Sequence, residues 1–217
     1  MTTLIVIAKE TIPGNVKTRL TPHFSPEHAA ELAAAAIADT FAAVAALPFT
    51  RRILAFDGTV IPEGADRFEI IPQVSGGLDE RLGAVFDECE GQTVLVGMDT
   101  PQLRPEHLAS VIGDWPDGID AWFGPAVDGG FWALGLARPN GDLIRGVEMS
   151  RSNTGVLQLV RLARAGLGIG MLATLTDVDT IVEATSVAAA APDTRFAARF
   201  RDLESLTGSD NRIEAAA

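Results

Sequence analysis

Short runs of uninterrupted apolar residues alternate with longer segments of helical periodicity along most of the chain. The clearest run is 93–98 (TVLVGM), and Leu4–Ala8 (LIVIA) is similar. Continuous apolar residues are typical of strands that are buried on both faces of a parallel sheet. The alternation therefore predicts an α/β fold in which helices cover both faces of a mostly parallel sheet.

The remaining elements follow from the same patterns. Strands are also predicted at 52–57, 68–74, 120–125, 131–136 and 171–175, and helices at about 26–47, 78–90, 105–112, 150–165, 180–191 and 195–206. Pro72 places the 68–74 strand at an edge or at its own end, because proline cannot donate to a strand ladder. The strands at 120–125 and 131–136 have no helix between them, which predicts an antiparallel pair.

Composition limits the class of protein. The 217 residues are 47% hydrophobic, which favours one domain over 1–207, followed by a disordered tail at 208–217. The net charge of -12 and the lack of a Lys/Arg block argue against a nucleic-acid partner. A single cysteine, Cys89, allows no internal disulfide and favours a cytoplasmic protein. The sequence also predicts no membrane partner, and it leaves an oligomer possible.

Charged residues follow several predicted strands at the point where each strand ends. Lys17 and Arg19 come after the first strand, and Asp99 comes directly after 93–98. Asp177 and Asp179 follow the last strand. Ligands of open α/β sheets bind outside the carboxyl ends of the strands, so we expect these side chains to converge there. An anionic phosphate ligand, bridged to carboxylates by a divalent cation, accounts for both signs of charge.

Each part of this constellation also has a plainer interpretation. Lys17 and Arg19 can clamp phosphates beside a flexible Gly14, but they are equally compatible with a solvated loop. Asp99 is either a metal ligand or the cap of the helix that follows. Asp177 and Asp179 would face the same side of an extended segment and suit Mg²⁺, or they belong to a capping turn before Thr180.

Two glycine pairs complete the candidate site. Asp128 precedes Gly129 and Gly130 in what is by default a tight turn, where Asp128 could also contact a ligand or act as a base. Gly76 and Gly77 open the predicted helix at 78–90, and exposed N–H groups at a helix start bind anions or the edge of a base. Asp79 in that first turn favours a base or ribose over a phosphate.

Five segments in order resemble the bacterial family DUF2064, also described as glycosyltransferase A-like: PGNVKTRLTP, QVSGGLDERLGAVF, VLVGMDTPQL, GPAVDGGFWALGL and LTDVDT. The resemblance covers about residues 5–180 and implies a GT-A-like fold, which sugar nucleotidyltransferases and the phospholactate or phosphoenolpyruvate guanylyltransferases share. The Lys-Ser-Arg-Leu motif of those guanylyltransferases corresponds to 17–20 here. Their Mg²⁺-binding aspartates correspond to Asp99, Asp177 and Asp179.

The resemblance implies Mg²⁺ or Mn²⁺ as cofactor and a nucleotide-binding set of Ala8, Gly14, Lys17, Arg19, Gly76, Gly77, Asp79, Gly129 and Gly130. Lys17, Arg19 and Asp128 are the expected catalytic residues. Two departures limit what carries over. Asp79 stands where the guanylyltransferases have asparagine, so the resemblance does not define the base. The 128–131 loop belongs to the DUF2064 pattern and has no clear counterpart in those enzymes.

Three functions remain open at this point. The favoured one is Mg²⁺-dependent nucleotidyl transfer from a nucleoside triphosphate to an unknown small-molecule acceptor. The second is a glycosyltransferase with a nucleotide-sugar donor, in which Asp128 would serve as the base. The third is a nucleotide-binding protein without catalysis. Pyrophosphate release would distinguish the first from the second, which releases a nucleoside diphosphate.

Overall fold

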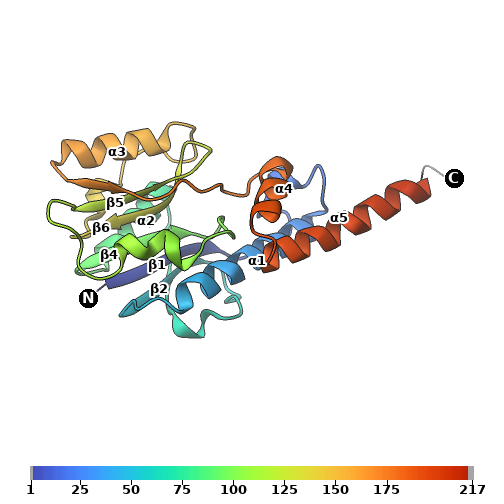
Figure 1. Cartoon of the computed structure of the whole chain (residues 1–217), viewed down its shortest axis with the longest axis horizontal. Coiled ribbons are helices and arrows are strands. Elements are labelled where there is room, and N and C mark those ends of the chain that lie inside the picture. Colours follow the sequence, from blue (N-terminus) through green and yellow to red (C-terminus); the bar gives the residue numbers. More distant parts are fainter. Residues whose placement is uncertain (1, 215–217) are drawn as a thin grey trace.

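A seven-stranded sheet forms one half of an elongated molecule, with α4 and α5 on its other side (Figure 1). The structure is a computed structural model that describes the backbone of residues 2–214 and the side chains of residues 2–206. The strands are β1 (Thr2–Lys9), β2 (Arg51–Asp57), β3 (Glu69–Pro72), β4 (Gln92–Gly97), β5 (Ala121–Pro125), β6 (Phe131–Leu136) and β7 (Ile169–Met171), in the spatial order β3-β2-β1-β4-β6-β5-β7.

All strands except β6 run in the same direction. β1 pairs in parallel with β2 and β4, β2 pairs in parallel with β3, and β5 pairs in parallel with β7. β6 is antiparallel to both β4 and β5. The mostly parallel sheet, the antiparallel pair and the edge position of β3 are therefore confirmed.

Helices cover both faces of the sheet, as predicted. The helices are α1 (Pro26–Ala45), α2 (Leu78–Asp87), α3 (Thr154–Arg164), α4 (Ile181–Ala190) and α5 (Arg195–Glu214), and short 3-10 turns are η1 (Thr18–Leu20), η2 (Ala65–Arg67), η3 (Pro105–Val111) and η4 (Gly141–Leu143). Leu4 and Val6 of β1 belong to the core that α1 and η3 share, whereas Ile5 belongs to the core under α2 and α3. This alternation follows from the two-residue period of a strand.

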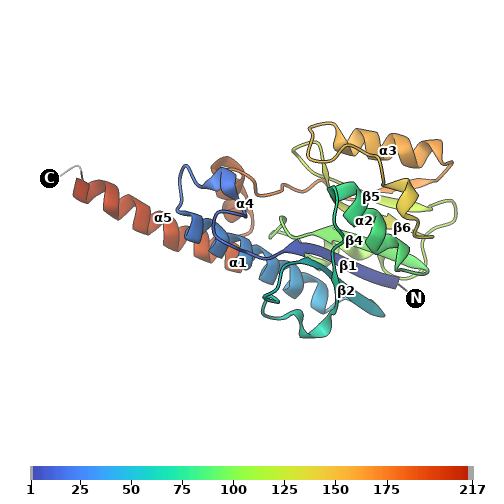
Figure 2. The ribbon, with the colours of Figure 1, turned by 180° about the vertical axis from the view of Figure 1, so that it is seen from behind.

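A second unit of packing lies beside the sheet. Helices α1, α4 and α5 form their own apolar cluster, and α5 extends away from the sheet in both views (Figures 1 and 2). The carboxylate of Asp39 in α1 caps α5, because its two oxygens accept from the backbone N–H groups of Arg195 (2.9 Å) and Phe196 (2.8 Å). Leu20, which lies after β1, and Val178, which lies after β7, are buried in the same cluster. The cluster therefore anchors the segments after these two strands to the helices.

Several predicted elements differ in extent or type. The short helix predicted at 105–112 is present, and it is the 3-10 helix η3. The helix predicted from residue 150 begins only at Thr154, since Ser150 has a left-handed backbone with φ 58°. β7 is displaced toward the N-terminus of the predicted 171–175 strand, although Leu175 still forms an isolated bridge with Ala126.

The predicted starts of α1, α2, α4 and α5 lie within one residue of the observed ones. Ser25 caps α1 by accepting from the backbone N–H of His28 (3.2 Å), with Pro26 in the first helical position. At the other end of the chain, α5 continues to Glu214, within the segment where a disordered tail was expected. Residues 215–217 of that predicted tail lie outside the described residues.

Within the described part of the chain, one helix, α1, is long and apolar enough to cross a membrane by length and composition alone. In the structure, 61% of its most apolar 18-residue stretch is buried inside the protein, against the sheet and against α5. Its apolar residues are therefore accounted for by packing within the fold.

Candidate functional site

A cavity of about 700 Å³ opens at the carboxyl ends of the parallel strands. It is lined by the loops after β1, β4 and β5, by the starts of α2 and α3, and by the segment after β7. Many of the predicted site residues line it: Ala8, Lys17, Arg19, Asp99, Asp128, Gly130, Asp177 and Asp179. The structure thus brings residues from four distant segments to one place, while their chemical roles stay predictions.

The segment after β7 reaches Asp99 through backbone hydrogen bonds. It first runs beside β5, where the N–H of Leu175 donates to the carbonyl oxygen of Pro125 (3.1 Å). The N–H of Val178 then donates to the carbonyl oxygen of Asp99 (2.9 Å). Because Val178 is fully buried among the helices, its two neighbours Asp177 and Asp179 are left to line the cavity.

Lys17 is the cation at the centre of this acidic group. Its backbone is left-handed (φ 47°), and its side chain is only 6% exposed. The Nζ atom contacts a carboxylate oxygen of Asp99 and the carbonyl oxygen of Val178, and lies 3.8 Å from Asp179 Oδ1. A left-handed, non-glycine residue costs free energy, so these contacts must hold the loop in place.

Arg19 is held less tightly than Lys17. One of its guanidinium nitrogens donates to Asp179 Oδ2 at 2.9 Å, but its side chain is 70% exposed. Exposed ion pairs contribute little free energy, so Arg19 can exchange Asp179 for another anion at small cost. The loop therefore presents one buried and one available cation to the cavity.

Asp177 shows that the carboxylates are not fully neutralised. Burial, together with the negative charges of Asp99, Asp128 and Asp179, raises its pKa to about 7, although Lys17 acts to lower it. A carboxylate with this pKa is protonated in about half of the molecules at neutral pH, because the positive charge beside it is too small to keep it ionised. Oxygen donors with excess negative charge fit a divalent cation in their chemistry.

The geometry for a metal ion is not preformed. Within the part of the chain that the structure describes, no group of three or more His, Cys, Asp or Glu side chains lies close enough to hold one. The Lys17 ammonium instead contacts Asp99 and approaches Asp179. The donor set therefore fits a divalent ion chemically, but the ion and Lys17 would require the same carboxylates. The metal assignment stays a prediction.

Asp128 lies on a loop that packs closely against the turn before α3. The side chain is exposed, and its Oδ1 accepts from the N–H of Gly130 (2.8 Å). Gly129 has φ 89°, and a Cβ there would lie 1.9 Å from the carbonyl oxygen of Ser152. The N–H of Gly155 donates to the carbonyl oxygen of Gly129 (2.8 Å). Glycine is thus required for contact between the two loops, and Gly129 itself does not line the cavity.

Besides Gly129, four predicted binding residues lie outside the lining: Gly14, Gly76, Gly77 and Asp79. Gly77 is the N-cap residue of α2, in agreement with the predicted helix start. The Asp79 carboxylate accepts from the N–H of Gly146 (2.8 Å), so it joins α2 to the chain after η4. The residues of α2 that do line the cavity are Leu78, Arg81 and Leu82.

Sequence reasoning missed Gln73, which follows β3 and lines the cavity. Its Nε2 donates to the carbonyl oxygens of Ala8 (2.8 Å) and Ala55 (2.9 Å), and its Oε1 accepts from Arg81 (3.2 Å). The rule that ligand residues follow strand ends could have identified it. The turn at 149–152, which also lines the cavity, was interpreted only as the start of a helix.

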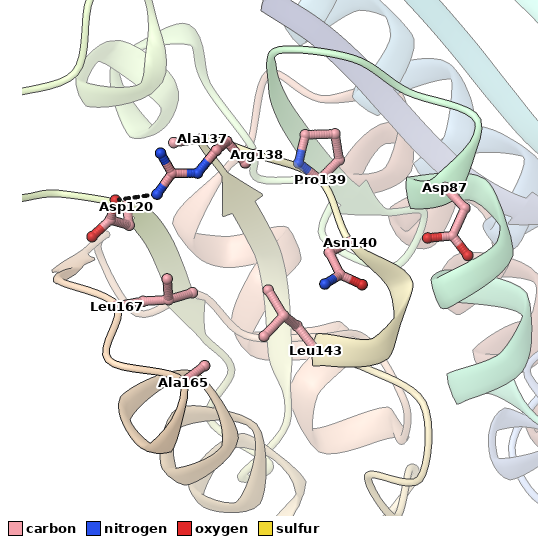
Figure 3. A pocket seen from close by; sticks show the side chains of 9 residues that line it. All are labelled: Asp87, Asp120, Ala137, Arg138, Pro139, Asn140, Leu143, Ala165 and Leu167. Atoms are coloured by element: carbon pink, nitrogen blue, oxygen red, sulfur yellow. Dashed lines mark hydrogen bonds and ion pairs between the residues drawn. The ribbon is translucent and has the colours of Figure 1, made fainter.

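A second cavity, of about 540 Å³, lies at the opposite end of β5 and β6 (Figure 3). None of the predicted site residues lines it. Its charged groups have partners within the protein: Arg138 pairs with Asp120 (3.4 Å), and Asp87 pairs with Arg145 (2.5 Å). The larger cavity, which the predicted residues line, is therefore the candidate site.

A family model matches residues 31–151, more than half of the chain, and the family is described as "Uncharacterized protein conserved in bacteria (DUF2064)". No protein with a curated description matches the sequence. The resemblance noted in the sequence is thereby confirmed.

Solved structures share the fold over nearly the whole chain. A candidate nucleotide-diphospho-sugar transferase from Desulfovibrio desulfuricans G20 has a TM-score of 0.82 at 22% identity, covering 96% of this chain and 97% of the other. A nucleotidyl transferase from Methanothermobacter thermautotrophicus has a TM-score of 0.57 at 15% identity, covering 86% and 95%. Likeness at these identities establishes the fold, and the predicted GT-A-like fold class is confirmed.

Proposed function

The chain belongs to the bacterial DUF2064 family, and we propose that it is a transferase that uses a nucleotide-activated donor. The favoured reaction is nucleotidyl transfer from a nucleoside triphosphate to a small-molecule acceptor, with Mg²⁺ or Mn²⁺ as cofactor. The observation that carries this proposal is the meeting of Lys17 and Arg19 with Asp99 and Asp179 at one rim of the cavity. The names of the similar structures support the same class of donor.

In this proposal Lys17 and Arg19 bind the phosphates of the donor. Arg19 is exposed and leaves Asp179 readily, and its planar guanidinium can pair two phosphate oxygens. Lys17 follows when it exchanges Asp99 for a phosphate oxygen. Both side chains then stabilise the negative charge that develops as pyrophosphate leaves, with no covalent protein intermediate.

Asp99, Asp177 and Asp179 would hold the divalent ion. When bound, such an ion neutralises phosphate charge and orients the leaving group. The raised pKa of Asp177 supports this assignment, because a carboxylate that holds a proton for want of positive charge gives up that proton to a cation. Lys17 has to leave these carboxylates for the same event, which links its movement toward the phosphates to occupation of the site.

Glycosyl transfer from a nucleotide sugar is the alternative, and one observation favours it. Asp128 is exposed on the cavity wall, and it is positioned by the hydrogen bond from Gly130 rather than by an ion pair. A carboxylate in that place can accept a proton from an acceptor hydroxyl. The two reactions share the donor-binding residues and differ in the bond of the donor that breaks.

Thermal melting tests the shared part of both proposals. Mg²⁺ together with a panel of nucleoside triphosphates and nucleotide sugars should raise the melting temperature, because a ligand that binds only the folded state stabilises it. Asp99→Asn should lose the part of the shift that depends on Mg²⁺. Asp142→Asn is the control, since that side chain is 85% exposed and lies outside the cavity.

An Asp99→Asn variant that shifts as much as the parent would show that the metal assignment is wrong. Products then separate the two reactions. Pyrophosphate released from a triphosphate in the presence of an acceptor mixture supports nucleotidyl transfer. A nucleoside diphosphate released from a nucleotide sugar supports glycosyl transfer. Binding without turnover, over both donor classes and a broad acceptor panel, would instead indicate a nucleotide-binding protein.

A further inference from the structure

The turn at 149–153, between η4 and α3, forms a wall of the larger cavity. None of the residues proposed to bind the donor phosphates lies in this turn. Ser150, Arg151 and Ser152 all line the cavity. Among the described residues, none of these three side chains makes a hydrogen bond or ion pair within the protein. The turn therefore presents two hydroxyl groups and one guanidinium to whatever enters.

Arg151 differs from every other cation of the cavity. Lys17 and Arg19 contact Asp99 and Asp179, and Lys9 donates to the carbonyl oxygen of Asn15 (2.8 Å). Arg81 donates to Asp57 (2.6 Å), to Gln73 and to the carbonyl oxygen of Gly76. In the described part of the chain, Arg151 is thus the one cavity-lining cation whose side chain has no protein partner.

The turn holds Arg151 in a defined place. The Thr154 hydroxyl accepts from the backbone N–H of Arg151 (3.1 Å) and donates to the carbonyl oxygen of Glu148 (2.8 Å), while Ser150 takes the left-handed backbone. Strained residues of this kind persist only where surrounding contacts over-determine them, and they concentrate at ligand sites. The backbone beneath the guanidinium is therefore preorganised.

The same turn is joined to the loop that carries Asp128. A Cβ on Gly129 would overlap the carbonyl oxygen of Ser152, and a Cβ on Gly155 would lie 2.7 Å from the carbonyl oxygen of Gly130. Two glycines thus let the loops pack backbone to backbone. Asp128 and Arg151 consequently lie on two loops that pack against each other. A molecule bound by Arg151 would therefore lie beside the loop that carries Asp128, the candidate base.

Charge decides what these two loops can bind. Four carboxylates line the cavity, at positions 99, 128, 177 and 179, and they repel an anionic acceptor. The donor phosphates would use Lys17 and Arg19. An anionic acceptor therefore needs a separate cation, and a guanidinium pairs with a carboxylate or phosphate group through two parallel hydrogen bonds.

We propose that the 149–153 turn is the acceptor-binding part of the cavity and that Arg151 recognises a carboxylate or phosphate group on the acceptor. This inference rests on the proposed transferase function, because only a transferase has an acceptor. Ser150 and Ser152 supply hydroxyl hydrogen bonds to the same group. Arg151 is a binding and specificity residue in this scheme, and the reacting hydroxyl of the acceptor lies toward Asp128.

A matched series of three-carbon probes tests the inference without any donor. Glycerol is neutral, glycerate adds a carboxylate, and glycerol 3-phosphate adds a phosphate, so the series separates the two anionic groups. Binding to the full chain is measured by calorimetry or ligand-observed NMR. We expect at least one charged probe to bind about ten-fold more tightly than glycerol, as a charge-assisted pair allows.

Variants assign that advantage to a residue. Arg151→Met should remove it and Arg151→Lys should keep part of it, because lysine retains the charge but not the paired donors. Arg138→Met is the matched control: that arginine is 84% exposed, lies at the second cavity, and should leave binding unchanged. Melting curves confirm that each variant is folded.

Three results would overturn the inference: charged probes that bind no better than glycerol, an advantage that survives in Arg151→Met, or an advantage that Arg19→Met removes instead. The last would place the anion among the donor-binding residues and leave the proposed function intact. Conversely, Arg151-dependent binding in a chain that binds no nucleotide would support the anion site and contradict the transferase proposal.

Discussion

Lys17 combines a left-handed backbone, a buried side chain and a contact with Asp99. The sequence predicted that this lysine faces phosphates, because loops after strand ends carry ligand contacts. Its partnership with Asp99 and Val178 could not be predicted, since it joins segments that are far apart in the chain. In the absence of other cations, Lys17 neutralises part of the carboxylate group.

Replacing Lys17 with methionine should therefore tighten metal binding. The variant removes a positive charge that requires the same carboxylates as the ion, so Mn²⁺ should bind several-fold more tightly, by about 1 kcal/mol. Electron paramagnetic resonance of free Mn²⁺ measures this without any turnover. Donor affinity should fall in the same variant. Unchanged or weaker Mn²⁺ binding would show that Lys17 and the ion do not compete.

Gly129 offers a second test at a single position. Gly129→Ala meets both a left-handed backbone and the carbonyl oxygen of Ser152, so it should destabilise the fold by about 2–5 kcal/mol in urea unfolding. Gly14→Ala is a matched control, because Gly14 has φ 82° but nothing within 4 Å of the added Cβ. That variant should cost only about 1–2 kcal/mol. Equal costs would contradict the close contact between the two loops.

Among the elements, the helices beside the sheet support the site from outside it. Leu20 follows Lys17 and Arg19 in η1, and Val178 lies between Asp177 and Asp179; both side chains are buried in the cluster of α1, α4 and α5. Packing of these helices therefore positions the cationic loop and the acidic segment together. Disturbing α5 should affect ligand binding as well as stability.

Asp39, which caps α5, gives a test of this support. Asp39→Ala leaves the N–H groups of Arg195 and Phe196 without their acceptor and should lower the free energy of unfolding by about 1–3 kcal/mol. Urea unfolding measures the loss. Nucleotide-induced thermal shifts should weaken in the same variant, and an unaltered stability would show that the cap contributes nothing.

The pH dependence of the Asp39 carboxyl has a defined sign. Burial raises its pKa above the ordinary value of 3.8. The folded chain therefore holds this proton to higher pH than the unfolded chain, so the group favours folding at low pH and loses that contribution as the pH rises through the raised pKa. Relative to the parent, Asp39→Asn should be more stable at pH 7 than at pH 4. An equal difference at both pH values would contradict the shift.

The extent to which elements could be predicted depends on how they are stabilised. β1 and β4 are continuous apolar runs buried on both faces, so composition alone predicts them. β7 was displaced because its apolar continuation, through Leu172 to Leu175, lies beside β5 without regular pairing. The start of α3 was missed because Ser150 adopts a left-handed backbone that the sequence does not signal.

For the molecule as a whole, three apolar regions surround the carboxyl ends of the parallel strands. Two are the faces of the sheet, and the third is the cluster of α1, α4 and α5. Convergence at these ends was predictable, because all parallel strands end at the same edge. The contacts within the site were not, because they join segments that are far apart in the chain, and because Arg151 reaches the cavity from a turn that the sequence does not signal.

Cys89, the single thiol, reports on this packing. It is 6% exposed, its Sγ donates to the carbonyl oxygen of Val85, and burial raises its pKa. The native chain should therefore react slowly with a maleimide, at a rate that follows global unfolding across a urea series. Rapid labelling without urea would show that the core under α2 opens locally.

β6 is the strand that runs against the others. Its reversed direction means that the connection from β5 leaves and returns at the carboxyl ends of the parallel strands, without a helix on either face. A hairpin of that kind can gain or lose residues while every strand keeps its register. An insertion at this one bend would therefore change the cavity wall that carries Asp128, and its contact with the 149–153 turn, while the paired strands stay in register.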